Sequence, residues 1–159
     1  MIMNASLHQR FGKQLEKTIT GVLTPLGFDR QRRRWHRIKG SFIELVDLQS
    51  SRWGPQFYLN AGISIRGISP LNKPRLDDCH IYARLGEEPL GRALDGEDTT
   101  LNDVMREAII EEALKGEFLR WFEDMEDLQL VIRLFDSRKL WPPSTLINEE
   151  AQAYMRTLL

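Results

Sequence analysis

The chain has 159 residues, of which 42% are hydrophobic and 28% are charged, and its formal net charge is -1. This composition is typical of a folded globular protein and excludes a disordered chain, and no apolar run approaches the roughly 20 residues needed to span a bilayer. Cys79 is the only cysteine, which excludes an internal disulfide and a thiolate metal site, and no signal segment opens the sequence. We therefore expect a single cytoplasmic domain over residues 1–159, without a membrane partner.

The two halves of the chain carry opposite charges. Residues 1–85 contain 14 Lys and Arg against 6 Asp and Glu, whereas residues 86–159 contain 8 against 17. Such a split arises when one half binds an anionic partner, or when the two halves pack together and cancel. We favour cancellation, because the fold predicted below brings the halves into contact.

The first predicted element is an amphipathic helix over residues 4–23. Its apolar residues recur every three or four positions and form one stripe: Leu7, Phe11, Leu15, Ile19 and Val22. Pro25 and Gly27 follow and end the helix. We expect the stripe to face the core.

A basic stretch from Arg32 to Arg37 comes next, with Trp35 and His36 among its cations. One interpretation is a nucleic-acid site, in which arginines hold phosphates and the indole stacks on a base. The other is an edge strand over residues 33–38, whose cations protect the open backbone while Trp35 points into the core. We favour the edge strand, because no nucleic-acid motif accompanies the run and the net charge is slightly negative.

Three further strands are predicted up to residue 85. A turn at Gly40 leads to FIELVDLQ, which is typical of an interior strand, and residues 57–66 and 79–85 then alternate strictly between apolar and other residues. Cys79 falls on the buried face, where a thiol is usually inert. The opposite face carries Tyr58, Asn60, Ser64, Arg66, His80, Tyr82 and Arg84.

The loop of residues 50–56, SSRWGPQ, places Arg52 and Trp53 next to this sheet. A tryptophan beside an arginine is either a recognition pair or an indole folded back over the edge of the core, and the second is more common. With His36 expected nearby, the candidate binding residues are Gln49, Arg52, Trp53, Tyr58, Asn60, His80, Tyr82 and Arg84.

Three phrases in this region resemble one bacterial family. TPLGF at residues 24–28, QSSRW followed by FYLNAGI within residues 49–63, and DCHIYARLG at residues 78–86 are similar, in order and spacing, to the family called domain of unknown function 4304. Its members have no established activity, cofactor or substrate, so the resemblance implies no functional residue. Members often carry a tryptophan-rich phrase after the RLG segment, where this chain has PLGRALDGED.

Residues 99–136 are predicted to form helices with an apolar face. Their acids are candidates for catalysis or metal binding, but at helical spacing we expect a solvated face: Glu111, Glu112, Glu117, Glu123, Asp124, Glu126 and Asp127. After a break at Trp141 and two prolines, a last helix is expected in the tail, residues 144–159. This tail docks either on its own domain or on another molecule, including a second copy.

The fold class that follows is α+β: a four-stranded antiparallel sheet over residues 33–85, with an N-terminal helix and C-terminal helices packed on one face. The polar face lacks the parts of an active site, because His80 is its only base and no carboxylate is predicted beside it. We expect no cofactor, no metal and a non-enzymatic protein-binding function, as in an immunity protein or an adaptor. The alternatives are an enzyme or small-ligand binder acting on an anionic molecule at Tyr58, His80 and Arg84, and nucleic-acid binding.

Overall fold

The computed structural model describes the backbone of residues 2–159 and the side chains of residues 7–159. Its centre is a sheet in which each strand pairs antiparallel with the next along the chain. The strands are β1 (Asp29–Gln31), β2 (Arg34–Lys39), β3 (Phe42–Ser50), β4 (Phe57–Ile65), β5 (Ile81–Leu85) and β6 (Leu146–Ile147). The α+β class and the antiparallel sheet are confirmed, but the sheet has six strands and not four.

The two additional strands are at the edges of the sheet. β1 has three residues and β6 has two, which is too short for an alternating pattern to show. Because β1 pairs with β2, the predicted edge position of residues 33–38 is wrong. Trp35 nevertheless points into the core, where its Nε1 donates to Thr20 Oγ1 at 3.1 Å.

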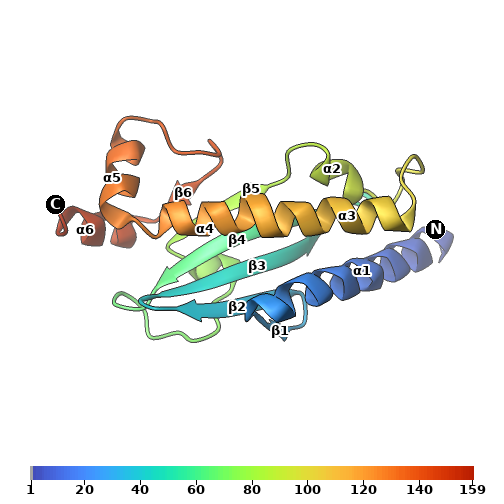
Figure 1. Cartoon of the computed structure of the whole chain (residues 1–159), viewed down its shortest axis with the longest axis horizontal. Coiled ribbons are helices and arrows are strands. Elements are labelled where there is room, and N and C mark those ends of the chain that lie inside the picture. The colour runs from blue at the N-terminus through green and yellow to red at the C-terminus, as the bar shows by residue number, and fades with distance from the viewer. Residues whose placement is uncertain (1) are drawn as a thin grey trace.

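Helices cover one face of the sheet (Figure 1). α1 (Ile2–Leu23) lies beside a long helix that consists of α3 (Asp103–Ala113), the π-helical segment η3 (Leu114–Phe118) and α4 (Leu119–Met125). α2 (Leu90–Ala93) contacts α3, while α5 (Leu128–Asp136) and α6 (Glu149–Arg156) lie near β6. Within residues 2–159, none of the helices combines the length and apolar character needed to cross a bilayer.

The core fills the space between these helices and the sheet. The alternating residues of β4 that were predicted to face inward are all buried: Phe57, Leu59, Ala61, Ile63 and Ile65. The α1 stripe is also buried, except that Leu7 at its start is 37% exposed. Burial of apolar side chains on both sides of this layer is the main source of stability in such a fold.

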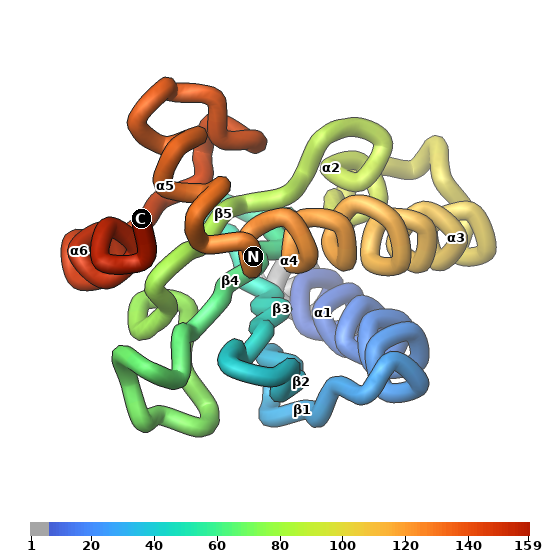
Figure 2. The backbone as a smooth tube through the Cα atoms, turned by 60° about the vertical axis from the view of Figure 1, so that its left-hand side comes forward, coloured from blue at the N-terminus to red at the C-terminus, as the bar shows by residue number. Residues whose placement is uncertain are grey.

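The second face of the sheet is covered in part by residues 66–80, which connect β4 to β5 and include the short helix η2 (Leu76–Asp78). Figure 2 shows this segment on the side of the sheet opposite α1. His36 Nε2 lies 2.7 Å from the Pro74 carbonyl oxygen, and Cys79 Sγ lies 2.6 Å from where a Cβ on Gly62 would stand. Cys79 is therefore buried as predicted, but on the sheet face that this segment covers and not on the face that the helices cover.

The tail differs from the single helix predicted over residues 144–159. It adds β6 to the sheet and then forms the shorter α6, whose Asn148 cap accepts a hydrogen bond from the Ala151 N–H at 2.8 Å. The tail docks on its own chain: Ala151 and Met155 are buried in the core, and Gln129 Nε2 donates to the Leu158 carbonyl at 2.7 Å.

Candidate functional site

The uncovered part of the second sheet face carries one polar residue on each of four neighbouring strands. Arg34 in β2 is paired with Asp47 in β3, Asp47 with Asn60 in β4, and Asn60 with Arg84 in β5. Directly opposed residues of an antiparallel sheet have Cβ atoms about 5 Å apart, so neighbouring side chains are within reach of one another. We call these four residues the polar row.

Asn60 connects the polar row. Its Nδ2 donates to Asp47 Oδ2 at 3.1 Å and to Gln49 Oε1 at 3.0 Å, while its Oδ1 accepts from Arg84 Nε at 3.2 Å. Arg84 Nη2 also donates to Gln49 Oε1 at 2.9 Å, and its guanidinium lies 4.1 Å from the centre of the Tyr58 ring. Asn60 is only 2% exposed, so its amide fixes the charged side chains on either side of it.

Arg84 is held in place without being neutralised. Its hydrogen-bond acceptors are two neutral amide oxygens, and among the side chains of residues 7–159 no carboxylate lies within 4.0 Å of it. A guanidinium whose position is fixed by uncharged partners keeps its charge and its remaining N–H groups for an anion. This end of the polar row therefore presents a guanidinium that is fixed in position and forms no ion pair with the described side chains.

An open groove of about 900 Å³ adjoins the other end of the polar row. Five arginines and three acids line it, together with Gln49 and Leu76: Arg30, Arg32, Arg33, Arg34, Arg75, Glu16, Asp47 and Asp77. Glu16 pairs with Arg30 at 3.2 Å and with Arg33 at 3.4 Å. In the part of the chain whose side chains are described, Arg32, Arg34 and Arg75 make no ion pair. We call this hollow the arginine groove.

Asp47 corrects the prediction that no carboxylate lies on this face. Burial raises the pKa of its carboxyl group, although the hydrogen bond from Asn60 and the charge of Arg34 act in the opposite direction. A signal for this residue was present in the sequence, because Val46 and Leu48 face the core and alternation sends Asp47 to the other side. Arg34 follows from the same rule, since it precedes the inward-facing Trp35.

The structure groups some of the predicted site residues and separates others. Gln49, Tyr58, Asn60 and Arg84 meet as predicted, and Tyr82 lies half-buried on the same face, opposite Gly62. His80 does not join them.

His80 precedes the first residue of β5 and is 2% exposed, with its Nδ1 accepting the Ile65 N–H at 2.8 Å. Burial lowers its pKa, and accepting at Nδ1 requires the neutral ring. His36 is also buried, and burial lowers its pKa as well. Both histidines therefore serve to fasten the segment that covers the sheet.

Arg52 and Trp53 line a separate hollow of about 450 Å³ with His8 and Glu97. The indole is 92% exposed, so the interpretation that it folds back over the core is wrong. His8 fixes the backbone of this loop by donating from Nδ1 to the Gly54 carbonyl at 3.0 Å.

One acid of the predicted solvated face, Glu126, is half-buried and turns one carboxyl oxygen towards a second acid, Glu44. Glu44 lies on the core face of β3 and is fully buried, with Oε1 accepting from Arg37 Nε at 2.7 Å. Glu126 from the end of α4 faces it, and burial together with the nearby Glu44 carboxyl raises the pKa of Glu126 to about 8. Each carboxyl has one buried oxygen with no donor among the described residues, and a proton shared between the two would satisfy both.

Among the described residues, no cluster of three or more His, Cys, Asp or Glu side chains is arranged to hold a metal ion. No curated protein and no solved structure matches the chain. A family model with the description "Domain of unknown function" matches residues 19–124, a range that contains β1 to β5, the whole polar row and all five arginines of the groove. The chain therefore belongs to the domain of unknown function 4304 family (DUF4304).

Proposed function

We propose that this protein is a non-enzymatic binding module that holds an acidic surface of another protein against the polar row and the arginine groove. The observation that carries the proposal is that Arg32, Arg34 and Arg75 line one groove without an ion pair among the described side chains. Neighbouring like charges repel one another, and a partner that supplies carboxylates removes this cost. We place the binding in the cytoplasm, where a free thiol such as Cys79 stays reduced.

The charge split of the chain supports an acidic partner. Each of the six ion pairs of the described side chains joins two residues of the same half, either within residues 1–85 or within residues 86–159. Direct pairing between the halves therefore does not consume the positive excess of the first half. That excess is available on the surface, where it speeds the approach of a negatively charged partner.

The side chains of the basic stretch and the shape of the groove favour a protein partner over a nucleic acid. Trp35 is completely buried, so the basic stretch offers no ring on which a base stacks. Two of its arginines are engaged internally, Arg33 with Glu16 at 3.4 Å and Arg37 with Glu44 at 2.7 Å. The groove is shallow, which suits a segment of a protein surface.

The test is capture of a partner from a lysate of the cells that make this protein. We expect the wild-type protein to retain one partner in stoichiometric amount, and the double variant Arg34→Glu/Arg75→Glu to lose it. The control is Lys13→Glu/Lys17→Glu, which makes the same charge change at two exposed positions of α1. Retention of the same proteins by all three forms would refute the proposal.

The second candidate is an enzyme or small-ligand binder that acts on an anionic molecule in the same groove. Asp47 favours it, because a carboxylate whose pKa is raised by burial, next to several arginines, is a common arrangement for a general base. Thermal-shift screening with nucleotides and sugar phosphates distinguishes the candidates, since a ligand at 100 times its Kd adds about 2.7 kcal/mol of stability. If the wild type converts such a ligand and an Asp47→Asn variant binds it without converting it, the enzyme would be established.

A further inference from the structure

A third hollow opens within the sheet, where β5 leaves β4. The β4–β5 ladder ends at the pair Leu59–Leu85, and the chain then departs through residues 86–95 before it returns to β4. It rejoins at the bridge between Gln56 and Asp95 and at the hydrogen bond from the Phe57 N–H to the Leu94 carbonyl, 2.9 Å long. The space enclosed between these points is about 470 Å³, which is within the range of small-molecule sites. We call it the sheet opening.

The sheet opening has charges of opposite sign among its lining residues and an apolar wall. Tyr58 is the half-buried aromatic residue of this wall, and behind it lie Phe57, Leu59, Leu85 and Leu94, each at most 3% exposed. Arg84 supplies the positive charge, and two of its five N–H donors are used by Asn60 and Gln49, which leaves three without an acceptor among the described residues.

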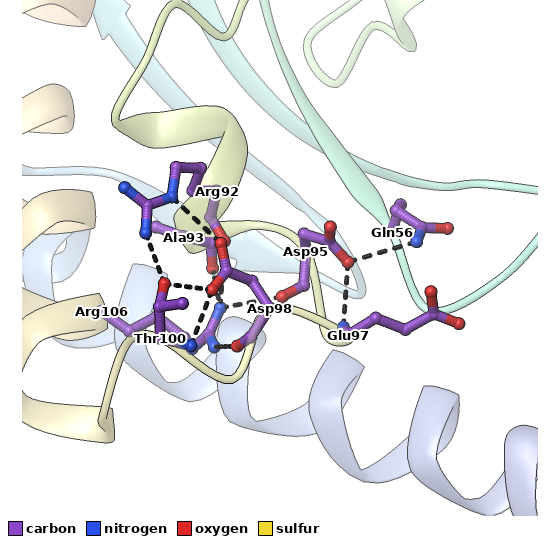
Figure 3. Close-up of polar contacts among 8 residues, drawn as sticks. All are labelled: Gln56, Arg92, Ala93, Asp95, Glu97, Asp98, Thr100 and Arg106. Carbon is purple, nitrogen blue, oxygen red and sulfur yellow. Dashed lines mark hydrogen bonds and ion pairs between the residues drawn. The ribbon is translucent and has the colours of Figure 1, made fainter.

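Glu87 and Asp95 supply the negative charge, and neither lies within 4.0 Å of a cationic group among the described side chains. Asp95 Oδ1 accepts from Gln56 Nε2 at 3.2 Å and from the Glu97 N–H at 2.9 Å (Figure 3), while Oδ2 has no donor among the described residues. The acids and Arg84 therefore line one cavity without neutralising each other.

The Asp95 side of the sheet opening is held in a fixed position. Arg106 is 6% exposed and reaches from α3 into the loop that follows α2, where Nη1 donates to the Ala93 carbonyl at 2.7 Å and to the Asp95 carbonyl at 3.2 Å. Nη2 donates to the Asp98 carbonyl at 3.0 Å (Figure 3). Arg106 fixes the backbone at Asp95, and Asn60 and Gln49 fix Arg84. Little conformational entropy is therefore lost when a ligand binds.

We propose that the sheet opening binds a small zwitterion. Its carboxylate pairs with the free N–H groups of Arg84, its ammonium group pairs with Glu87 and Asp95, and a short apolar segment between them contacts the ring of Tyr58. A simple anion would be repelled by the two acids, and a simple cation would be repelled by Arg84. The pairing of both charges is what selects the zwitterion.

The probes are 4-aminobutyrate, 6-aminohexanoate and 8-aminooctanoate, compared with hexanoate and hexylamine, which each retain one charge of the middle compound. We expect calorimetry to show binding of at least one amino acid of the series, and binding about tenfold or more weaker for the compound with a single charge. Amide chemical shifts of residues 57–59 and 86–95 are expected to change with the bound probe.

Two variants and one control locate the site. Arg84→Gln removes the cation and is expected to weaken binding about tenfold, and Ser144→Trp places an indole in the lining at an exposed position and is expected to abolish it. Arg66→Gln removes an exposed arginine near the far end of β4 and is expected to bind as the wild type does. Binding of hexanoate as tight as that of the amino acids, equal binding by wild type and Arg84→Gln, or no binding of any of the series at millimolar concentration would overturn the proposal.

The zwitterion proposal shares Arg84 with the proposed function, but the two experiments change different residues. The partner experiment changes Arg34 and Arg75, which line the arginine groove and not the sheet opening. Either result can fail while the other stands.

Discussion

Glu44 and Glu126 form a buried carboxyl pair between the sheet and α4. Glu44 has no exposed surface and is compensated by Arg37 at 2.7 Å, whereas Glu126 meets it from the end of the helix without an ion pair among the described side chains. Two carboxylates in contact cannot both ionise cheaply, and this contact, added to burial, accounts for the raised pKa of Glu126. The folded protein therefore holds a proton here that the unfolded chain releases.

This proton makes stability depend on pH. The pKa of Glu126 is about 8 when folded and 4.5 when unperturbed, so its contribution is present below about pH 4.5 and is lost as the pH rises towards about 8. Glu126→Gln stays neutral and offers an N–H to Glu44. Urea unfolding at about pH 9 should show the variant to be more stable than wild type by about 1 to 2 kcal/mol, a discounted value because Glu126 is half-buried.

The control for this prediction is Glu123→Gln, which removes an exposed acid from the same helix. Its unfolding free energy should follow that of the wild type at each pH. If Glu126→Gln lost stability with rising pH as steeply as the wild type does, the carboxyl pair would not hold the proton.

The loop of residues 93–100 depends on Arg106 for its position. Its guanidinium donates to three carbonyls of the loop and lies 4.8 Å from the centre of the Phe11 ring in α1. One side chain thus ties the loop to two helices. The loop's backbone has few other long-range hydrogen bonds, among them the Gly96 N–H to the Pro55 carbonyl at 2.8 Å.

Arg106→Met keeps the length of the side chain and removes its donors. The buried Ala93 carbonyl and the partly buried Asp95 and Asp98 carbonyls then lose this donor, and we expect the free energy of unfolding to fall by about 2 to 4 kcal/mol. Hydrogen exchange of the Gly96 amide should quicken more than that of the strands. Arg120→Met, at an exposed position of α4, is the matched control and should leave both quantities unchanged.

Periodicity predicted the long elements and missed the contacts between distant segments. α1 follows from a spacing of 3.6, β4 and β5 follow from a spacing of 2, and β3 follows from a run with two apolar faces. Alternation alone brought Asn60 and Arg84 to one face. The same rule was carried two residues too far at Cys79 and His80, because β5 begins only at Ile81. Arg75 could not be predicted to join the arginine groove, since its loop is positioned by contacts far away in the sequence, such as His36 with Pro74.

The two faces of the sheet are covered to different extents. One face is sealed by α1, α3 and α4, and the other is covered by residues 66–80 only in part (Figure 2). The uncovered part brings together the polar row, the arginine groove and one rim of the sheet opening. A surface that the chain itself leaves open, with arginines that form no ion pair with any described side chain, is suited to recognition.

The central claim is that this open part of the sheet binds acidic segments of proteins. The most direct measurement is a nuclear magnetic resonance titration of the labelled protein with a capped hexaglutamate peptide at low and at high salt. We expect amide shift changes confined to residues 30–34, 47–49, 60, 75–77 and 84 that diminish as salt is added. Shift changes on the outer surfaces of α3 and α4, or none at low salt, would contradict it.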